Sequence, residues 1–182
     1  MRKEKTALKA VVIGGALAAM HSASYAVDSA SLEFATGNQT QMVRIGTQWK
    51  WARHWKFSNG AHIGGYWDLS LAQWRGKRYQ NVAGQKQDIT SIGITPVFRF
   101  QNETLKGFYA EAGIGAHYLS GLYDNNDSQL STRFEFGDHI GAGYVFQNNL
   151  DLGLKIQHFS NGGIRNPNDG VNFAVVRVSY PF

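Results

Sequence analysis

The sequence contains no cysteine in 182 residues, so disulfides do not hold this fold together. Proline is scarce as well, and three prolines leave room for long strands, in which proline interrupts the hydrogen-bond ladder. Beyond residue 26 the chain has no apolar run near the roughly 20 residues that a membrane-spanning helix needs. These absences exclude a disulfide scaffold and a helical membrane protein.

The first 26 residues have the pattern of a secretory signal. A positively charged start precedes a short apolar run over 10–20, and a small-x-small cleavage site ends at Ala26. A single membrane anchor is the alternative, but the run is too short and no stop-transfer pattern follows it. We expect residues 1–26 to be a signal peptide and residues 27–182 to form one domain.

Much of the positive charge lies in that signal. The whole chain has a formal net charge of +5, and the signal carries four cations and one anion, which leaves +2 for residues 27–182. Nucleic-acid binding depends on a strongly basic surface, so it loses its main support and we expect no nucleic-acid partner.

Residues 27–182 alternate through most of their length between an apolar row and a row of polar residues or glycine. This period of two is typical of strands with one face in an apolar environment. Aromatic residues make up 13% of the chain, glycine occurs 21 times, and the last residue, Phe182, belongs to the apolar row. Eight segments show the pattern: 31–36, 43–57, 63–71, 90–100, 108–118, 134–146, 152–156 and 174–182.

An even number of such strands predicts an all-β fold, an eight-stranded antiparallel transmembrane β-barrel of the outer membrane. A soluble lipocalin-like barrel is the alternative, with the apolar row pointing inward around a ligand. The charges of the polar row argue against it, because they suit the packed ionic interior of a narrow barrel. These residues are Arg99, Glu111, Arg133, Glu135 and Lys155.

Connection lengths give the orientation of this barrel, because short turns are typical of the periplasmic side and long loops of the extracellular side. Two short turns contrast with three long connections: 58–60 and 147–149 against 76–87, 120–132 and 161–170. His158 and Ser160 continue the lipid-facing row of the strand over 152–156, so we expect them at the extracellular rim.

His158 and Ser160 are the candidate chemical groups. Two positions apart on a strand, they project from the same face about 6.6 Å apart along it, which lets an imidazole nitrogen lean toward a serine oxygen. With Ser160 as nucleophile and His158 as general base, the pair predicts a serine esterase. A polar interface histidine beside an ordinary strand-end serine is the alternative.

Strand register predicts the neighbours of His158. If Phe146 pairs with Leu150, Asp138 lies opposite His158 on one side. If Ser160 pairs with Gly170, Asn172 lies opposite His158 on the other. Four polar residues then share a lipid-facing row, where polar groups are costly unless they are functional.

The connection 161–170 is rich in Gly, Asn and Pro and follows the serine directly. Its backbone N–H groups and an amide side chain could stabilise an oxyanion, although an ordinary extracellular turn has the same composition. Arg165 within it is either a phosphate contact or a solvated charge.

The segment 158–170, His-Phe-Ser-Asn-Gly-Gly-Ile-Arg-Asn-Pro-Asn-Asp-Gly, resembles the signature of the lipid A 3-O-deacylases, the PagL family. Segments 95–99 and 136–139 are similar to further parts of that family. The resemblance implies an outer-membrane esterase that removes the 3-O-linked acyl chain of lipid A, without metal or cofactor. It also implies the roles of nucleophile for Ser160, base for His158, support for Asp138, and oxyanion or loop residues for Asn161, Gly163 and Asn168.

One position departs from the family pattern. The catalytic acid of the best-known members is a glutamate, and the matching residue here is Asn172. An amide accepts a hydrogen bond from the imidazole but does not stabilise imidazolium by charge. We therefore hypothesise that Asp138 supplies the negative charge and Asn172 assists.

Two other functions remain open at this point: an outer-membrane phospholipase and a non-catalytic structural barrel. A calcium-assisted phospholipase needs a carboxylate cluster, and the sequence offers none. Lipid A, as part of lipopolysaccharide, is the favoured substrate for two reasons taken together: the site is expected at the outer rim, where lipopolysaccharide forms the leaflet, and the family resemblance implies it. The sequence also leaves a homodimer open.

Overall fold

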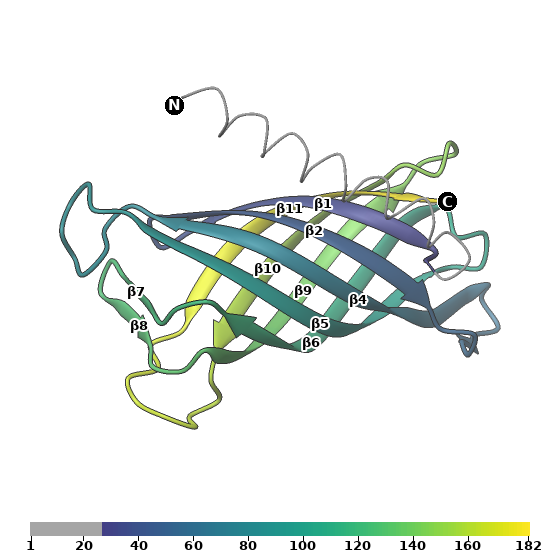
Figure 1. The fold of residues 1–182 in the computed structure, drawn as a ribbon. Coiled ribbons are helices and arrows are strands. Elements are labelled where there is room, and N and C mark those ends of the chain that lie inside the picture. Colours follow the sequence, from purple (N-terminus) through teal and green to yellow (C-terminus); the bar gives the residue numbers. More distant parts are fainter. Residues whose placement is uncertain (1–26) are drawn as a thin grey trace.

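The computed structural model describes residues 27–182, and the expected signal over 1–26 lies outside the described residues. Eight long antiparallel strands form a closed barrel (Figure 1). The strands are β1 (Ser29–Gly37), β2 (Thr40–Lys50), β4 (Ala61–Gly76), β5 (Gln87–Asn102), β6 (Gly107–Leu119), β9 (Phe134–Val145), β10 (Asp151–Ser160) and β11 (Val171–Pro181).

Pairing between β2 and β4 closes the sheet, so all eight long strands have two neighbours and the barrel has no open edge. Three short strands lie outside this set: β3 (Trp55–Lys56), which pairs with β4, and β7 (Tyr123–Asn125) and β8 (Ser128–Leu130), which form a separate hairpin. The eight-stranded barrel predicted from the sequence is therefore confirmed. Within residues 27–182, no helix has the length and apolar character to cross a membrane.

The long connections gather at one end of the barrel, as expected from their lengths. Figure 1 shows the β7–β8 hairpin and the connection after β10 at this end, opposite the end that holds the C-terminus. The short turns between β5 and β6 and between β9 and β10 lie at the C-terminal end. The end with the long connections is called the extracellular mouth below, following the rule for membrane barrels.

The outer face of the barrel is apolar. Ile140, Leu154 and Ile156 are 69%, 65% and 58% exposed, although neighbouring residues of the same strands are buried. In water such a surface would be unfavourable, whereas hydrocarbon accommodates it. The alternation of the sequence therefore places its apolar row outside, as predicted.

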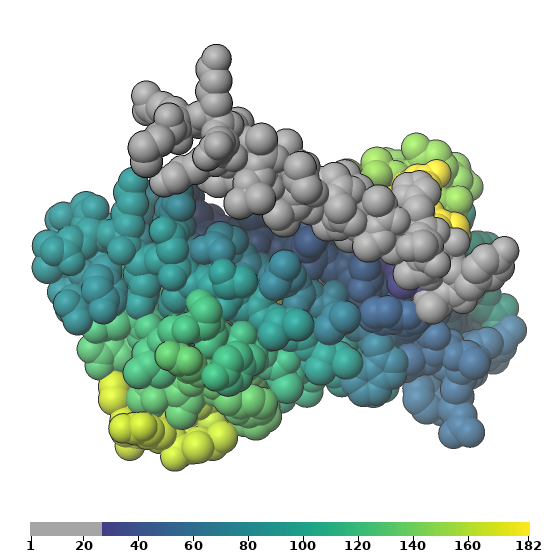
Figure 2. Space-filling model, in the orientation of Figure 1, coloured from purple at the N-terminus to yellow at the C-terminus, as the bar shows by residue number. Residues whose placement is uncertain are grey.

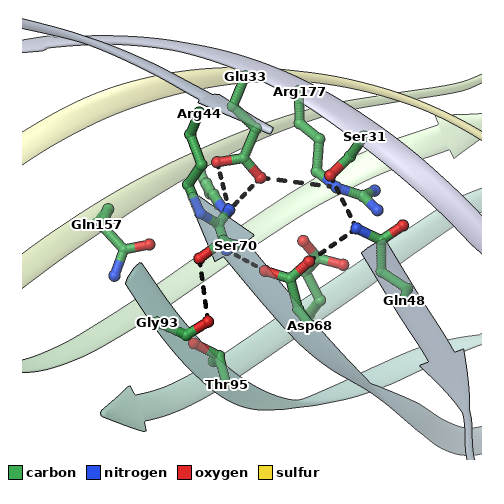
Figure 3. A network of polar contacts seen from close by, with 12 residues as sticks. Ser31, Glu33, Arg44, Gln48, Asp68, Ser70, Gly93, Thr95, Gln157 and Arg177 are labelled. Carbon is green, nitrogen blue, oxygen red and sulfur yellow. Dashed lines mark hydrogen bonds and ion pairs between the residues drawn. The ribbon is translucent and has the colours of Figure 1, made fainter. Parts of the chain in front are cut away.

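The interior contains a network of ion pairs (Figure 3). Glu33 accepts from Lys155 at 2.9 Å and lies 2.6 Å from Arg44, which also pairs with Asp68. A second group, around Asp151 and Glu111, binds Arg99 and Arg177 with distances of 2.6–3.1 Å. Within residues 27–182 these two groups pair four cations with four anions, which fits the ionic interior expected from the sequence.

Glu33→Ala is expected to lower the free energy of unfolding by about 3–5 kcal/mol, because it leaves buried Arg44 and Lys155 without their shared carboxylate. Urea unfolding in detergent, followed by tryptophan fluorescence, measures this change. Glu103→Ala is the matched control, because the Glu103–Lys56 pair is exposed and worth about 1 kcal/mol or less. Equal destabilisation by both substitutions would contradict a structural role for the interior network.

Two details differ from the sequence prediction. The strand expected over 43–57 is interrupted, since β2 ends at Lys50 and β3 begins at Trp55. The N–H of Trp51 still donates to Gly65, but the Trp51 ring lies over that glycine and packs on Phe98 at a centroid distance of 4.8 Å. Arg133, expected in the interior row, precedes β9 and is exposed, because the strand begins one residue later.

Candidate active site

The predicted neighbours of His158 are confirmed by the strand register. His158 of β10 lies opposite Asp138 of β9 and opposite Asn172 of β11. Ser160 lies opposite Phe136, near the extracellular mouth. His158 and Ser160 are half-buried and continue the outer row of Leu152, Leu154 and Ile156, so three strands bring the polar residues together on the lipid-facing wall.

Among the residues that the structure describes, the His158 side chain has one hydrogen-bond partner. Its Nδ1 atom lies 2.8 Å from Oδ1 of Asn172. An amide oxygen only accepts hydrogen bonds, so Nδ1 is the donor in this contact, and in the neutral imidazole the lone pair is then on Nε2. The tautomer is the one that a general base needs for a proton from a serine hydroxyl.

Asp138 contributes less contact than the sequence suggested. Its carboxylate makes no side-chain hydrogen bond or ion pair within residues 27–182, although its backbone carbonyl accepts from Gln157 at 3.1 Å. The cross-strand position is as predicted, but the orienting hydrogen bond comes from Asn172. We therefore now expect Asn172 to orient the imidazole and Asp138 to act only through its charge at a distance.

The inward neighbours of the site residues hold their strands in place. Phe159 lies between His158 and Ser160 in the chain, and Phe173 follows Asn172; both rings point into the barrel and are almost fully buried. They pack on Trp74 with ring centroids 4.7 and 5.1 Å away. Because core aromatic side chains have little freedom, this packing fixes the backbone that carries the outward-facing site.

Gly170 forms part of the wall beside His158. Its φ angle is +75°, a conformation that side chains disfavour, and an added Cβ would lie 2.5 Å from Cε1 of the imidazole. The glycine therefore makes room for the ring next to Asn172. In the sequence Gly170 is a register partner of Ser160 and the last residue of the connection 161–170, and nothing in the pattern signals its positive φ.

Asn161, directly after Ser160, organises the loop 161–170. Its side chain is fully buried; Oδ1 accepts from the N–H of Gly163 at 3.0 Å, and Nδ2 donates to the carbonyl of Arg165 at 2.7 Å. Its own N–H donates to Oδ1 of Asn168 at 2.9 Å. Asn161, Gly163 and Asn168, the residues expected to serve the oxyanion, are thus brought together. Hydrogen bonds join the backbone N–H groups of Asn161 and Gly163 to the side-chain amide oxygens of Asn168 and Asn161.

The N–H of Gly162 differs from its neighbours. In the part of the chain that the structure describes, it has no hydrogen-bond partner, whereas the N–H groups of Asn161, Gly163 and Ile164 are all donated within the loop. Gly162 has a φ angle of +65° and lies two residues after Ser160. Its N–H is therefore one of the backbone donors of the loop that is not already used.

Ser160 and His158 are close in the chain but are not hydrogen-bonded to each other among residues 27–182. Catalytic hydrogen bonds often tighten only when substrate is bound, so the separated hydroxyl and imidazole are compatible with a serine nucleophile. The same residues contain no cluster of three or more metal-ligand side chains. The groups that the site itself presents are the Ser160 hydroxyl and the His158 imidazole, which suit nucleophilic and general acid–base chemistry.

The sequence and the fold of this chain are similar to those of known proteins. The chain matches the family "Lipid A 3-O-deacylase (PagL)" over residues 41–181. It is 35% identical to the lipid A deacylase PagL of Pseudomonas aeruginosa, covering 86% of this chain and 87% of that protein. It is 32% identical to the lipid A deacylase PagL of Bordetella bronchiseptica, covering 84% and 82% respectively. The crystal structure of the outer membrane enzyme PagL superposes with a TM-score of 0.72 at 27% identity, covering 85% of this chain and 99% of that one.

Proposed function

The chain belongs to the lipid A 3-O-deacylase (PagL) family of outer-membrane enzymes, and we propose that Ser160 and His158 carry out its ester hydrolysis. The observation that carries the assignment of residues is the 2.8 Å contact between His158 Nδ1 and Asn172 Oδ1 on the lipid-facing wall. Because Nδ1 faces Asn172, Nε2 of the imidazole points away from it. A base that takes a proton from Ser160, two residues along the strand, requires this orientation.

The reaction has two steps. Ser160 Oγ attacks the carbonyl carbon of the 3-O-linked acyl chain while His158 Nε2 takes the hydroxyl proton. The tetrahedral intermediate collapses, the bond to the sugar oxygen breaks, and His158 returns the proton to that oxygen. Water then attacks the acyl-serine with His158 again as base, which releases the fatty acid and restores Ser160.

The oxyanion of the tetrahedral intermediate requires hydrogen-bond donors. The free N–H of Gly162 is the first donor in the proposal. The N–H groups of Asn161 and Gly163 are a second source, because each already points at an amide oxygen that a more negative substrate oxygen can replace. Asn168, which accepts from the Asn161 N–H, holds the loop in this form between turnovers.

The position of the site suits a lipid substrate. Below His158, the outer wall presents Ile156 and Ile140, both well exposed, with the small residue Ala174 beside them. An acyl chain of the outer leaflet lies along such a surface without leaving the membrane, while its ester reaches Ser160 at the rim. We also propose that residues 1–26 direct export and are then removed. The residues His158, Ser160 and Asn172 of the proposed site all lie in one chain.

Arg165→Gln is expected to raise KM about tenfold for bisphosphorylated lipid A and less than twofold for the same lipid A without its phosphates. The carbonyl of Arg165 is held by two side-chain donors, while its exposed guanidinium has no partner within residues 27–182 and is free to bind a phosphate. Initial rates in mixed micelles measure this difference. Arg53→Gln, in the turn at the opposite end, is the matched control, and an equal rise for both substrates would contradict a phosphate contact.

The proposed function is tested with the purified protein. Incubated with lipid A in detergent, it is expected to release one 3-hydroxy fatty acid per molecule, and mass spectrometry of the residual lipid A identifies the 3-position. A parallel incubation with phospholipid vesicles tests for phospholipase activity. Fatty acid released from the phospholipid alone would replace the proposal by a phospholipase, and release from neither would favour a structural barrel.

A further inference from the structure

The extracellular mouth holds a segment that the proposed reaction does not use. Segment 123–131 contains the β7–β8 hairpin and Ser131, and it lies beside the loop 161–170 at the same end of the barrel (Figures 1 and 2). Sequence reasoning gave it no role, since it reads as part of a long connection. The segment has one set of contacts with the barrel and another with the loop that follows Ser160.

On the barrel side the segment is anchored by buried residues. Tyr123 and Leu130 are each 1% exposed and belong to the apolar core around Trp74, whose ring centroid lies 6.1 Å from that of Tyr123. Asn125 is fully buried; its Oδ1 accepts from the N–H of Arg78 at 2.7 Å, and its Nδ2 donates to the carbonyl of Asn38 at 2.8 Å. The hairpin is therefore tied to two other connections of the mouth.

On the loop side, the segment forms a short ladder with residues 167–169. The N–H of Asp169 donates to the carbonyl of Gln129 at 3.1 Å, and the N–H of Ser131 donates to the carbonyl of Pro167 at 3.1 Å. The Asp169 carboxylate accepts from the N–H of Gln129 at 2.8 Å. Leu130 pairs with Asn168 between them in an isolated bridge.

Ser131 also reaches further into the loop. Its Oγ donates to the carbonyl of Arg165 at 2.8 Å, the same oxygen that accepts from Nδ2 of Asn161 at 2.7 Å. Asn161 Nδ2 lies 3.4 Å from Ser131 Oγ, so the three groups form a closed set. Asn161 follows Ser160 directly and holds the N–H of Gly163, which links Ser131 to the backbone donors of the site.

We propose that segment 123–131 positions the loop 161–170 for catalysis, with Ser131 as a positioning residue. The loop contains Gly162 and Gly163, both with positive φ angles, and such glycines lose much conformational freedom when they are held in one geometry. Contacts made in advance by the segment reduce that loss in the transition state, where donors must meet the oxyanion within a few tenths of an ångström. The inference rests on the proposed role of Ser160 as nucleophile.

The test compares three single substitutions in the full-length protein. Ser131→Ala is expected to lower kcat about tenfold with KM changed less than twofold, because lipid binding does not involve the hydroxyl. Ser131→Thr keeps a hydroxyl and is expected to restore kcat to within threefold of wild type. Ser128→Ala, in the same hairpin but without a side-chain hydrogen bond in the described residues, is the matched control and keeps wild-type kcat.

A second measurement separates positioning from folding. A fluorophosphonate that labels the active serine also forms an oxyanion-like adduct, so its labelling rate should fall in Ser131→Ala by the same factor as kcat. The heat-modifiable mobility of the barrel on gels should stay unchanged.

If the wild type is active and Ser131→Ala has the same kcat, the positioning role of Ser131 is overturned while the proposed function stands. Loss of activity in proportion to loss of folded barrel would overturn it as well. A wild type with neither deacylase activity nor labelling at Ser160 would overturn the proposed function and this inference with it.

Discussion

Ser160→Ala is expected to reduce lipid A deacylation by about 10⁶-fold, below the limit of detection, while the barrel stays folded. Alanine removes the only atom with which residue 160 can attack an ester, and the half-buried position on the outer wall tolerates the smaller side chain. In the wild type, mass spectrometry of lipid A from expressing cells should show the loss of one hydroxyacyl group. In the variant, the lipid A should match that of cells without the protein.

The control for this result is Ser58→Ala, which changes an exposed serine in the turn at the opposite end of the barrel. It is expected to deacylate at the wild-type rate. Heat-modifiable mobility should show equal amounts of folded barrel in the membranes with wild type, Ser160→Ala and Ser58→Ala. A difference in deacylation then reflects the reaction and not the amount of folded protein. Full activity in Ser160→Ala would show that the nucleophile lies elsewhere, and the assignment of His158 would fall with it.

Substitutions at position 172 are expected to change kcat in both directions. Asn172→Ala should lower kcat about 10³-fold, because it removes the acceptor that fixes Nδ1–H of His158, and a wrongly oriented or wrongly protonated imidazole is a poor base. Asn172→Asp should raise kcat about tenfold or more, because a carboxylate in the same place also stabilises the imidazolium formed in the transition state.

Asp138→Asn separates the two candidates for the acid role. Because the Asp138 carboxylate accepts no hydrogen bond from His158 within residues 27–182, it is expected to act only through a screened charge, and Asp138→Asn should lose less than about fivefold in kcat. Initial rates on purified lipid A rank the variants, with exposed Gln41→Ala as a control for a lost amide on the outer wall. A larger loss of kcat in Asp138→Asn than in Asn172→Ala would make Asp138, and not Asn172, the main partner of His158.

The fold could be predicted from the sequence because a strand has only two faces. Residues such as Leu154 and Lys155 must then point to opposite sides, and one apolar row is enough to decide which side meets lipid. The register of His158 followed from the short turn between Phe146 and Leu150, whose hydrogen bond fixes every later pair in the two strands. Local rules of this kind set most of the barrel.

The details that depend on side-chain rotamers and distant segments could not be predicted in the same way. Asp138 and Asn172 both lie opposite His158, and only the orientation of the side chains decides which one binds the ring. The contact of Ser131 with the carbonyl of Arg165 joins segments 34 residues apart through a connection without periodicity. The strand break after Lys50 coincides with the packing of the Trp51 ring over Gly65, a contact that alternation does not encode.

Ion pairs occupy much of the barrel interior, and the proposed site lies on the outer wall, where substrate and fatty acid would meet the protein. Catalysis at that site is expected to be a two-dimensional process: the enzyme would encounter lipid by lateral diffusion, and its rate would follow the mole fraction of substrate in the surface and not its bulk concentration. Dilution of the membrane with inert lipid should therefore slow turnover even when the total amount of lipid A is constant. The released fatty acid enters the same surface, so accumulating product dilutes the remaining substrate and turnover declines as the leaflet is processed.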